Sequence, residues 1–256
     1  MKLNKLIAIA TISLLSGGIS MAQKALNLED IVAGNIIQTK GIGSMTWLKD
    51  GERYSRLENN KQTGGTDIVA YRAKDNSREV IIPSSLLTDK STGRPIPVRS
   101  VSWSADNEKV LIYNNTRRVW RYDTRGDYWV LNLKDGALRQ LGKGMPESSM
   151  MFAKFSPDGT RVAYVSNNNI YVEDIDSGKI TQLTKDGSDT IVNGTFDWVY
   201  EEEFSCRDGF RWSPDGNHIA YWQSDTKGTG VFDIINNVDS IYAKVIHFPY
   251  PKAGTT

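Results

Sequence analysis

The stretch FSPDGTRVAY, residues 155–164, contains the features that decide the fold. Pro157 presets φ for the first central position of a turn, Asp158 can hydrogen-bond back to the turn backbone, and Gly159 accepts a positive φ. A hairpin turn is therefore expected here, with a strand on each side. The residues that follow, 162–164, are β-branched, small and aromatic, which is typical of a strand.

The same pattern occurs three times, and a weaker copy precedes the three. The clear copies are WSADNEKVLIY, FSPDGTRVAY and WSPDGNHIAY, which begin at Trp103, Phe155 and Trp212, and the weaker copy begins at Trp47. These aromatic anchors lie 56, 52 and 57 residues apart. A period near ~50 residues indicates a propeller blade rather than a helical solenoid.

Each repeat has room for four strands, as a blade requires. In the copy that begins at Phe155, further strands are expected at 162–166, 170–175 and 180–184, with turns between them. Residues 41–256 would then hold about four blades, whereas closed propellers usually carry about four to eight. Because the pattern is interrupted at Thr256, we expect a piece of a longer polypeptide.

The first 22 residues indicate a secretory signal peptide. The start is basic, Leu6 to Leu15 is an apolar run, and Ser20-Met21-Ala22 offers small residues where a signal peptidase cleaves. The apolar run is too short to span a bilayer, and a buried N-terminal helix is the less favoured alternative. We therefore predict a periplasmic or secreted protein with no membrane span after cleavage.

A short helix is predicted between the signal peptide and the first repeat. Apolar residues at 28, 31, 32 and 36 have helical spacing, and Asn27 can cap the helix. Such a helix needs something outside the propeller to pack on.

Charge, cysteine and histidine content exclude several functions. The net charge is +1, from 31 basic and 30 acidic residues, so neither nucleic acid nor an anionic membrane is favoured as a partner. Cys206 is the only cysteine and is predicted to be a packed or half-exposed thiol. His218 and His247 lack metal-ligand spacing, so we expect neither a metal nor a cofactor.

Three consecutive glutamates stand in FDWVYEEEF, residues 196–204. Like charges this close repel one another, and an acidic triplet in an arbitrary chain is usually a solvated surface run. Its surroundings make this one different. Trp198 and Tyr200 of this stretch are expected in the core, as are the repeat anchors Phe155 and Trp212.

The heptapeptide DWVYEEE at 197–203, followed by RWSPDG at 211–216 and FPYPKAG at 248–254, resembles the propeller of the dipeptidyl peptidase IV family. These are secreted or membrane-anchored serine exopeptidases, and the likeness covers most of the mature chain. The resemblance implies an eight-bladed propeller that caps an α/β-hydrolase domain. It also implies a short helix that carries Glu202 and Glu203 into the active-site cavity.

The resemblance implies a second binding group as well. In this family a propeller arginine holds the carbonyl oxygen of the substrate's second residue. The segment VWRY at 119–122 resembles the family's segment and makes Arg121 the candidate, with Arg117 and Arg118 as alternatives. The stretch FSCRDGF at 204–210 differs from mammalian relatives and is closer to bacterial ones.

Paired carboxylates suit a peptide's free N-terminus. An ammonium has three donors, and each carboxylate can accept a charge-assisted hydrogen bond from it. Internal peptides lack the ammonium and would leave both carboxylates unpaired and partly desolvated. Mutual repulsion should raise the pKa of one carboxyl while the site is empty.

The catalytic residues are expected elsewhere. No G-x-S-x-G nucleophile elbow occurs between Met1 and Thr256, and GIGSM at 41–45 does not fit. The resemblance places the Ser-Asp-His triad beyond residue 256, so this chain alone is predicted to be inactive.

The resulting prediction is an all-β chain: about four four-stranded blades of an eight-bladed propeller, preceded by a signal peptide and a short helix. The expected segments are a signal peptide at 1–22, a helical segment at 23–40 that docks on the hydrolase domain, and an incomplete propeller domain at 41–256. The whole protein would remove Xaa-Pro or Xaa-Ala dipeptides from peptides with a free N-terminus.

The expected partners are those substrates and the C-terminal α/β-hydrolase domain of the same polypeptide. Homodimerisation is expected from the resemblance, through a region corresponding to Val238 to Tyr250. Two alternatives remain: a prolyl tripeptidyl peptidase, and a non-catalytic periplasmic propeller that serves as a binding scaffold.

Overall fold

The computed structural model describes residues 27–32, 41 and 43–254. The chain divides into two units, Met1–Ile42 and Gly43–Thr256. In the first unit the described element is helix α2, Leu28–Val32, whose apolar side chains are exposed. The signal peptide and the rest of the predicted N-terminal helix lie outside the described residues. None of the helices among the described residues has the length and apolar content that crossing a membrane requires.

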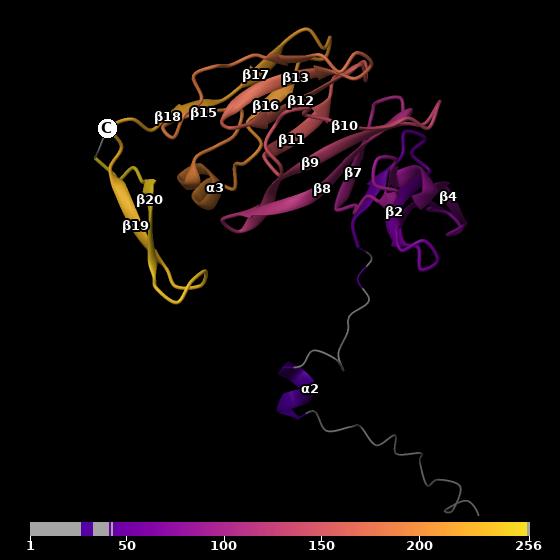
Figure 1. Ribbon diagram of the computed structural model, residues 1–256, viewed down its shortest axis with the longest axis horizontal. Coiled ribbons are helices and arrows are strands. Elements are labelled where there is room, and N and C mark those ends of the chain that lie inside the picture. The colour runs from indigo at the N-terminus through magenta and orange to yellow at the C-terminus, as the bar shows by residue number, and fades with distance from the viewer. Residues whose placement is uncertain (1–26, 33–40, 42, 255–256) are drawn as a thin grey trace, which may run out of the picture. The chain divides into compact units, whose positions relative to one another are not determined.

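The first repeat of the second unit is a four-stranded antiparallel sheet. Its strands pair in chain order: β1 Met45–Trp47, β2 Arg53–Asn59, β3 Thr66–Arg72 and β4 Arg78–Ile82. A connection follows that contains the 3-10 helix η1 Ser84–Leu87 and the short strands β5 Thr88–Asp89 and β6 Arg94–Pro95. The sheet lies on the right in Figure 1.

The second and third repeats also have four strands each. The second contains β7 Ser100–Trp103, β8 Lys109–Val119, β9 Tyr122–Asn132 and β10 Leu138–Gln140, and the third contains β11 Met150–Phe155, β12 Arg161–Ser166, β13 Asn169–Asp174 and β14 Ile180–Gln182. A single pair, Met150 with Gly126, joins the two repeats into one eight-stranded sheet. Because β8 and β9 have 11 residues each, their hairpin extends beyond β7 and β10.

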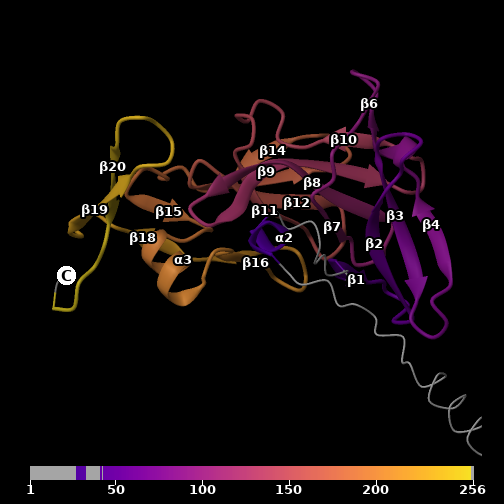
Figure 2. The same ribbon diagram turned by 90° about the horizontal axis from the view of Figure 1, so that it is seen from below.

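The fourth repeat is less regular than predicted. It contains β15 Ile191–Asn193, α3 Trp198–Phe204, β16 Phe210–Trp212, β17 Ile219–Tyr221, β18 Gln223–Asp225, and a hairpin of β19 Val231–Asn236 and β20 Lys244–Pro249. β16 pairs with β17, whereas β18 pairs with β15, on the other side of α3 in the chain. The helix interrupts the strand order, so this repeat consists of two-stranded sheets. Figures 1 and 2 show the repeats following one another toward the β19–β20 hairpin.

The predicted turn is confirmed and recurs in three repeats. The serine hydroxyl donates to the turn aspartate and accepts from the backbone N–H five residues later. The serine-to-aspartate distances are 2.6 Å for Ser104, 2.5 Å for Ser156 and 2.5 Å for Ser213. Gly159 and Gly216 have φ of +67° and +69°, the left-handed region that glycine occupies without a steric penalty.

Three apolar clusters join successive repeats. The first repeat packs on the second through Ile68, Ile82, Val110, Ile112 and Leu131. The second packs on the third through Leu111, Tyr128, Leu141, Met150 and Tyr164. The third packs on the fourth through Met151, Val165, Ile170 and Phe210. Each sheet thus covers its neighbour along the chain, as sequential blades would.

The predicted core aromatics are confirmed in part. Phe155 and Trp212 are half-buried and pack against these clusters, and Trp198 is half-buried as well. Tyr200 is 45% exposed, so its assignment to the core is wrong. The phase of helix α3, described next, explains why.

Candidate functional site

The helix that carries the three glutamates is short and capped at both ends. α3 has seven residues, a length at which an isolated helix is unstable in water. Asp197 caps its N-terminus by accepting a hydrogen bond from the backbone N–H of Tyr200 at 3.0 Å. At the other end Ser205 is left-handed, with φ of 55°, and the N–H of Cys206 donates to the carbonyl of Tyr200 at 3.0 Å.

The phase of α3 separates the three glutamates. Successive helical residues are rotated by about 100°, so residues at i, i+3 and i+4 share a face. Trp198, Glu201 and Glu202 share the face that packs against the protein, and all three are buried or half-buried. Tyr200, Glu203 and Phe204 share the exposed face. The charge repulsion expected of a triplet is reduced because the side chains diverge.

Glu202 pairs with the predicted arginine. Arg121 lies at the tip of the β8–β9 hairpin, and its Nε donates to Glu202 Oε2 at 2.5 Å. The Glu202 side chain is 12% exposed and that of Arg121 is 73% exposed. Two candidate residues that are 81 positions apart in the sequence are therefore in direct contact.

Glu203 lies on the solvent side of the same helix. Its Oε1 accepts a hydrogen bond from the hydroxyl of Tyr250 at 3.4 Å. Tyr250 directly follows β20, so Glu202 and Glu203 each have a partner from a different part of the chain. Both carboxylates remain acceptors with lone pairs for further donors.

Glu201 is the buried member of the triplet. Its Oε1 lies 3.8 Å from Nε of Arg207, and its side chain is 8% exposed. Burial raises the pKa of Glu201, Arg207 opposes this rise, and repulsion by Glu202 adds to it. Burial is therefore the main cause of the raised pKa of Glu201, which lies outside the predicted pair.

Aromatic side chains hold α3 against the rest of the unit. The centroid of the Trp198 ring lies 4.3 Å from the centroid of the Phe248 ring on β20 and 5.8 Å from that of the Tyr250 ring. Trp120, at the β8–β9 tip, contacts Trp198 edge-on at 6.3 Å. Contacts of this kind contribute about 0.5–1.5 kcal/mol each beyond area burial. The cluster joins the hairpin tip, the helix and β20 at one place.

The other candidate groups lie outside this constellation. Arg117 and Arg118 are exposed on β8, and Arg117 faces Arg125 across the hairpin. Cys206 is half-buried, as predicted, and its thiol donates to the carbonyl of Phe204 at 3.6 Å. Among the described residues, no group of histidine, cysteine, aspartate and glutamate side chains is arranged to hold a metal ion.

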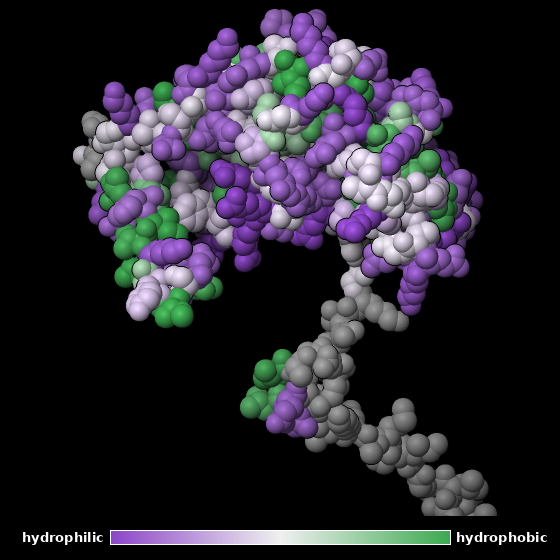
Figure 3. Space-filling model, viewed as in Figure 1, coloured by the Kyte–Doolittle hydropathy of each residue, from purple (hydrophilic) through white to green (hydrophobic). Residues whose placement is uncertain are grey.

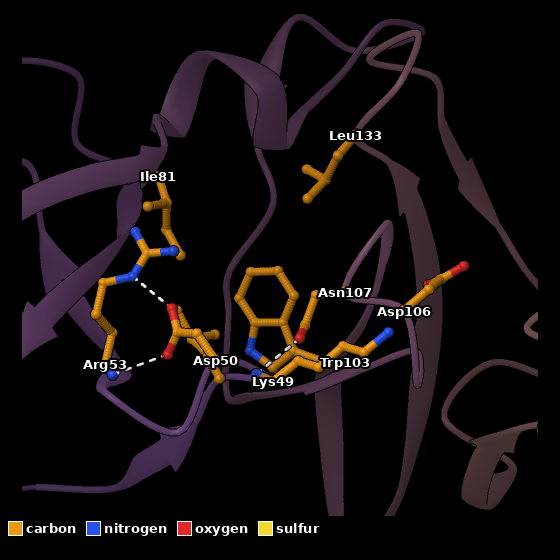
Figure 4. Close-up of a pocket in the computed structure, with 9 residues that line it drawn as sticks. Lys49, Asp50, Arg53, Ile81, Trp103, Asp106, Asn107 and Leu133 are labelled. Carbon is orange, nitrogen blue, oxygen red and sulfur yellow. Dashed lines mark hydrogen bonds and ion pairs between the residues drawn. The ribbon is translucent and has the colours of Figure 1, made fainter.

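A separate cavity of about 450 Å³ lies between the first and second repeats. Its apolar lining comes from Leu48, Ile81, Trp103 and Leu133 (Figure 4). Its polar groups bond to one another: Arg53 donates to Asp50 at 2.7 Å, and the N–H of Lys49 donates to Asn107 at 2.8 Å. None of the predicted site residues lines it.

Three residues of the constellation were not predicted from the sequence. Arg207 lies in FSCRDGF at 204–210, the stretch that is expected to differ from mammalian relatives, and this expectation was the available signal. Tyr250 lies in the FPYPKAG motif, which indicates the family resemblance and does not by itself mark Tyr250 as a site residue. Tyr122 is adjacent to Arg121, and the centroid of its ring lies 3.6 Å from Cζ of Arg207, a contact that no feature of the sequence indicated.

The comparison with known proteins agrees with this fold. The fold is mostly β and matches part of the N-terminal propeller region of dipeptidyl peptidase 4. Residues 104–256 match the family model of the dipeptidyl peptidase IV (DPP IV) N-terminal region. The chain belongs to this family, which confirms the resemblance seen in the sequence. The family is that of serine dipeptidyl peptidases, and the chain covers its N-terminal region.

Individual relatives show the extent of the similarity. Dipeptidyl aminopeptidase B of Saccharomyces cerevisiae is 31% identical over 240 residues, which cover 88% of this chain and 27% of the relative. A probable dipeptidyl-aminopeptidase B of Chaetomium globosum is 32% identical over 166 residues, 60% of this chain and 18% of the relative. The chain thus spans about a quarter or less of these relatives.

Solved structures give the same result. The crystal structure of Porphyromonas gingivalis dipeptidyl peptidase 4 superposes on this chain with a TM-score of 0.74 at 26% sequence identity. The superposed region covers 91% of this chain and 32% of the Porphyromonas gingivalis chain. A putative dipeptidyl aminopeptidase IV from Bacteroides ovatus has a TM-score of 0.54 at 18% identity and supports the fold alone.

Proposed function

We propose that this chain is the substrate-recognition part of a secreted serine dipeptidyl peptidase. Glu202 and Glu203 bind the N-terminal ammonium of a peptide, and Arg121 binds the carbonyl oxygen of its second residue. The whole protein removes Xaa-Pro or Xaa-Ala dipeptides, and a triad downstream of residue 256 breaks the bond. The observation that carries this proposal is the 2.5 Å contact between Arg121 and Glu202.

The geometry supports this division of roles. Arg121 uses one N–H on Glu202, and a guanidinium has four others that can donate to a carbonyl oxygen. Glu202 lies on the packed face of α3 and Glu203 on its solvent side, so a single ammonium at the boundary between these faces can donate a hydrogen bond to each carboxylate. A cation placed there would offset the negative charge of both carboxylates.

The proposal extends to the whole polypeptide. Residues 1–22 serve as a signal peptide that sends the protein to the periplasm or the exterior, and residues 23–40 dock on an α/β-hydrolase domain. Residues 41–256 form about four blades of an eight-bladed propeller. The three sheet-to-sheet clusters support successive blades, because each repeat buries its apolar face against the next.

The test of the ammonium site is Glu203→Gln in the full-length protein. Removing one partner of a charged hydrogen bond costs roughly 2–5 kcal/mol, so kcat/KM on an unblocked Xaa-Pro anilide should fall by about 30-fold or more. Steady-state kinetics at saturating and limiting substrate measure this change.

Two controls make the result specific. Glu79→Gln changes an exposed glutamate on β4 and should leave kcat/KM unchanged. An N-acetylated substrate lacks the ammonium and should be cleaved equally slowly by the wild-type protein and by Glu203→Gln. If Glu203→Gln keeps wild-type kinetics on the unblocked substrate, the assigned role is wrong.

We also propose that the full-length protein is a homodimer that uses the β19–β20 hairpin. The hairpin and its loop expose apolar side chains: Val231, Ile235, Val238, Ile241, Tyr242 and Val245. Figure 3 shows hydrophobic residues gathered on this hairpin at the lower left of the second unit. Contiguous exposed apolar surface of this kind marks interaction sites.

A further inference from the structure

We infer that Arg207 is a positioning residue that holds α3 and the β8–β9 tip in one arrangement. The inference rests on the proposed function, because it concerns the same recognition site. It assigns a role to an arginine that touches neither of the two predicted ammonium-binding carboxylates.

The backbone of Arg207 is anchored below the helix. Its carbonyl oxygen accepts a hydrogen bond from the hydroxyl of buried Thr195 at 3.0 Å, and Thr195 forms an antiparallel bridge with Asp208. Because the main chain is held at this point, the Arg207 side chain starts from a fixed backbone position. It is 24% exposed and extends toward both halves of the site.

One contact of the guanidinium is with α3. Glu201 Oε1 lies 3.8 Å from Arg207 Nε, and both atoms are enclosed without a hydrogen-bond partner among the described residues. The ion pair is therefore the interaction that offsets the burial of this carboxylate. Removing the cation would leave a buried charge uncompensated, which is strongly destabilising and would displace the helix residue next to Glu202.

The other contact is with the hairpin tip. Arg207 Cζ lies 3.6 Å from the centroid of the Tyr122 ring, a cation–π contact. Tyr122 follows Arg121, and Trp120 on the other side of Arg121 contacts Trp198 of α3. Both neighbours of Arg121 are thus tied to the region of the helix. This matters because the Arg121 side chain is itself 73% exposed and has little packing of its own.

Together these contacts form a closed ring that connects α3, the β8–β9 tip and Arg207. Glu202 binds Arg121, Arg121 is followed by Tyr122, Tyr122 lies under Arg207, and Arg207 pairs with Glu201, which precedes Glu202. Loss of Arg207 removes two of these contacts, the one with Tyr122 and the one with Glu201. The distance between the ammonium acceptors and the carbonyl donor would then vary, and misplacement by about 1 Å can reduce activity by about 100-fold.

The test is Arg207→Met in the full-length peptidase, which keeps an apolar stem and removes the charge. We expect KM for an unblocked Xaa-Pro anilide to rise about tenfold with a small change in kcat, since ground-state binding groups are misplaced. Tyr122→Leu should change KM in the same direction, and Tyr122→Phe, which keeps the ring, should recover most of that loss. Arg211→Met, at an exposed arginine of β16, should behave as the wild type.

A double-mutant cycle with Arg121→Met separates positioning from general stability. If Arg207 acts through the hairpin tip, the double variant should lose less than the product of the two single losses. Multiplicative losses, or an unchanged KM in Arg207→Met, would overturn the inference. If Arg207→Met does not fold, Arg207→Lys and the two Tyr122 variants probe the same contacts.

The same experiments distinguish this inference from the proposed function. A large effect of Glu203→Gln together with a silent Arg207→Met overturns the positioning role alone. A silent Glu203→Gln overturns the proposed function, whatever Arg207→Met does.

Discussion

At the scale of single residues, the turn aspartates are the most repeated feature of the chain. Asp106, Asp158 and Asp215 each accept a serine hydroxyl and a backbone N–H two residues later. The hydrogen bond from Ser156 is the main reason that the pKa of Asp158 is lowered to about 2, and Ser213 has the same effect on the pKa of Asp215. The ionised carboxylate is thus part of each turn.

This gives a prediction for acid stability. The pKa of Asp158 is lower in the folded chain than the ordinary 3.8, so the folded state gains stability above that value and loses it as pH falls toward about 2. Asp158→Asn removes this titration, and its Tm should therefore fall less steeply between about pH 5 and pH 2. Thermal unfolding followed by circular dichroism measures both slopes. Equal slopes would contradict the assigned role of the carboxylate.

At the scale of elements, α3 decides whether the site exists. A seven-residue helix depends on its caps and on tertiary contacts, because its own hydrogen bonds are few. Asp197 provides the N-cap, and the aromatic cluster of Trp198, Phe248 and Tyr250 provides the contacts. The glutamates keep their directions only while this helix is formed.

Asp197→Ala should therefore weaken substrate recognition. Loss of an N-cap costs about 0.5–2 kcal/mol, and the first turn, which carries Glu201, should fray. We expect kcat/KM on the unblocked anilide to fall about threefold to tenfold in the full-length protein. Asp197→Asn and Asp197→Ser retain a capping oxygen and should stay near the wild type. An equal loss in all three variants would argue against the cap.

At the scale of the whole molecule, successive sheets cover one another and one hairpin remains uncovered. Apolar residues of the first three repeats form clusters between successive sheets. In the loop between β19 and β20, Val238 is 91% exposed and Ile241 is 98% exposed. Surface of this kind is costly to leave in water, at about 25 cal/mol per Å².

The proposed homodimer predicts the effect of two charges in this loop. Val238→Asp combined with Ile241→Asp should convert the full-length protein from dimer to monomer, because unpaired carboxylates would be buried at the interface. Sedimentation velocity measures the change. Val80→Asp, at an exposed apolar position of β4, is the matched control and should stay dimeric. A wild-type protein that is monomeric at micromolar concentration would refute the proposal.

The repeats and their turns could be predicted from the sequence because their chemistry is local. The Ser-Pro-Asp-Gly turn depends on residues within five positions of one another, and the alternation of strand and turn follows directly. The strand pairing of the fourth repeat could not be predicted in this way, since β18 pairs with β15 across the inserted helix. That pairing depends on packing between distant segments, and such packing produces no repeating pattern in the sequence.

For the site, the sequence by itself determined which residues are candidates, because the DWVYEEE motif at 197–203 can be recognised without knowing how the chain folds. Only the tertiary structure decided that Glu201 turns inward to Arg207, that Glu202 meets Arg121, and that Glu203 stays on the solvent side. The physical reason is that side-chain direction depends on the phase of the helix and on where its caps set its ends. Contacts between residues 81 positions apart form only when sheets and helix have packed together.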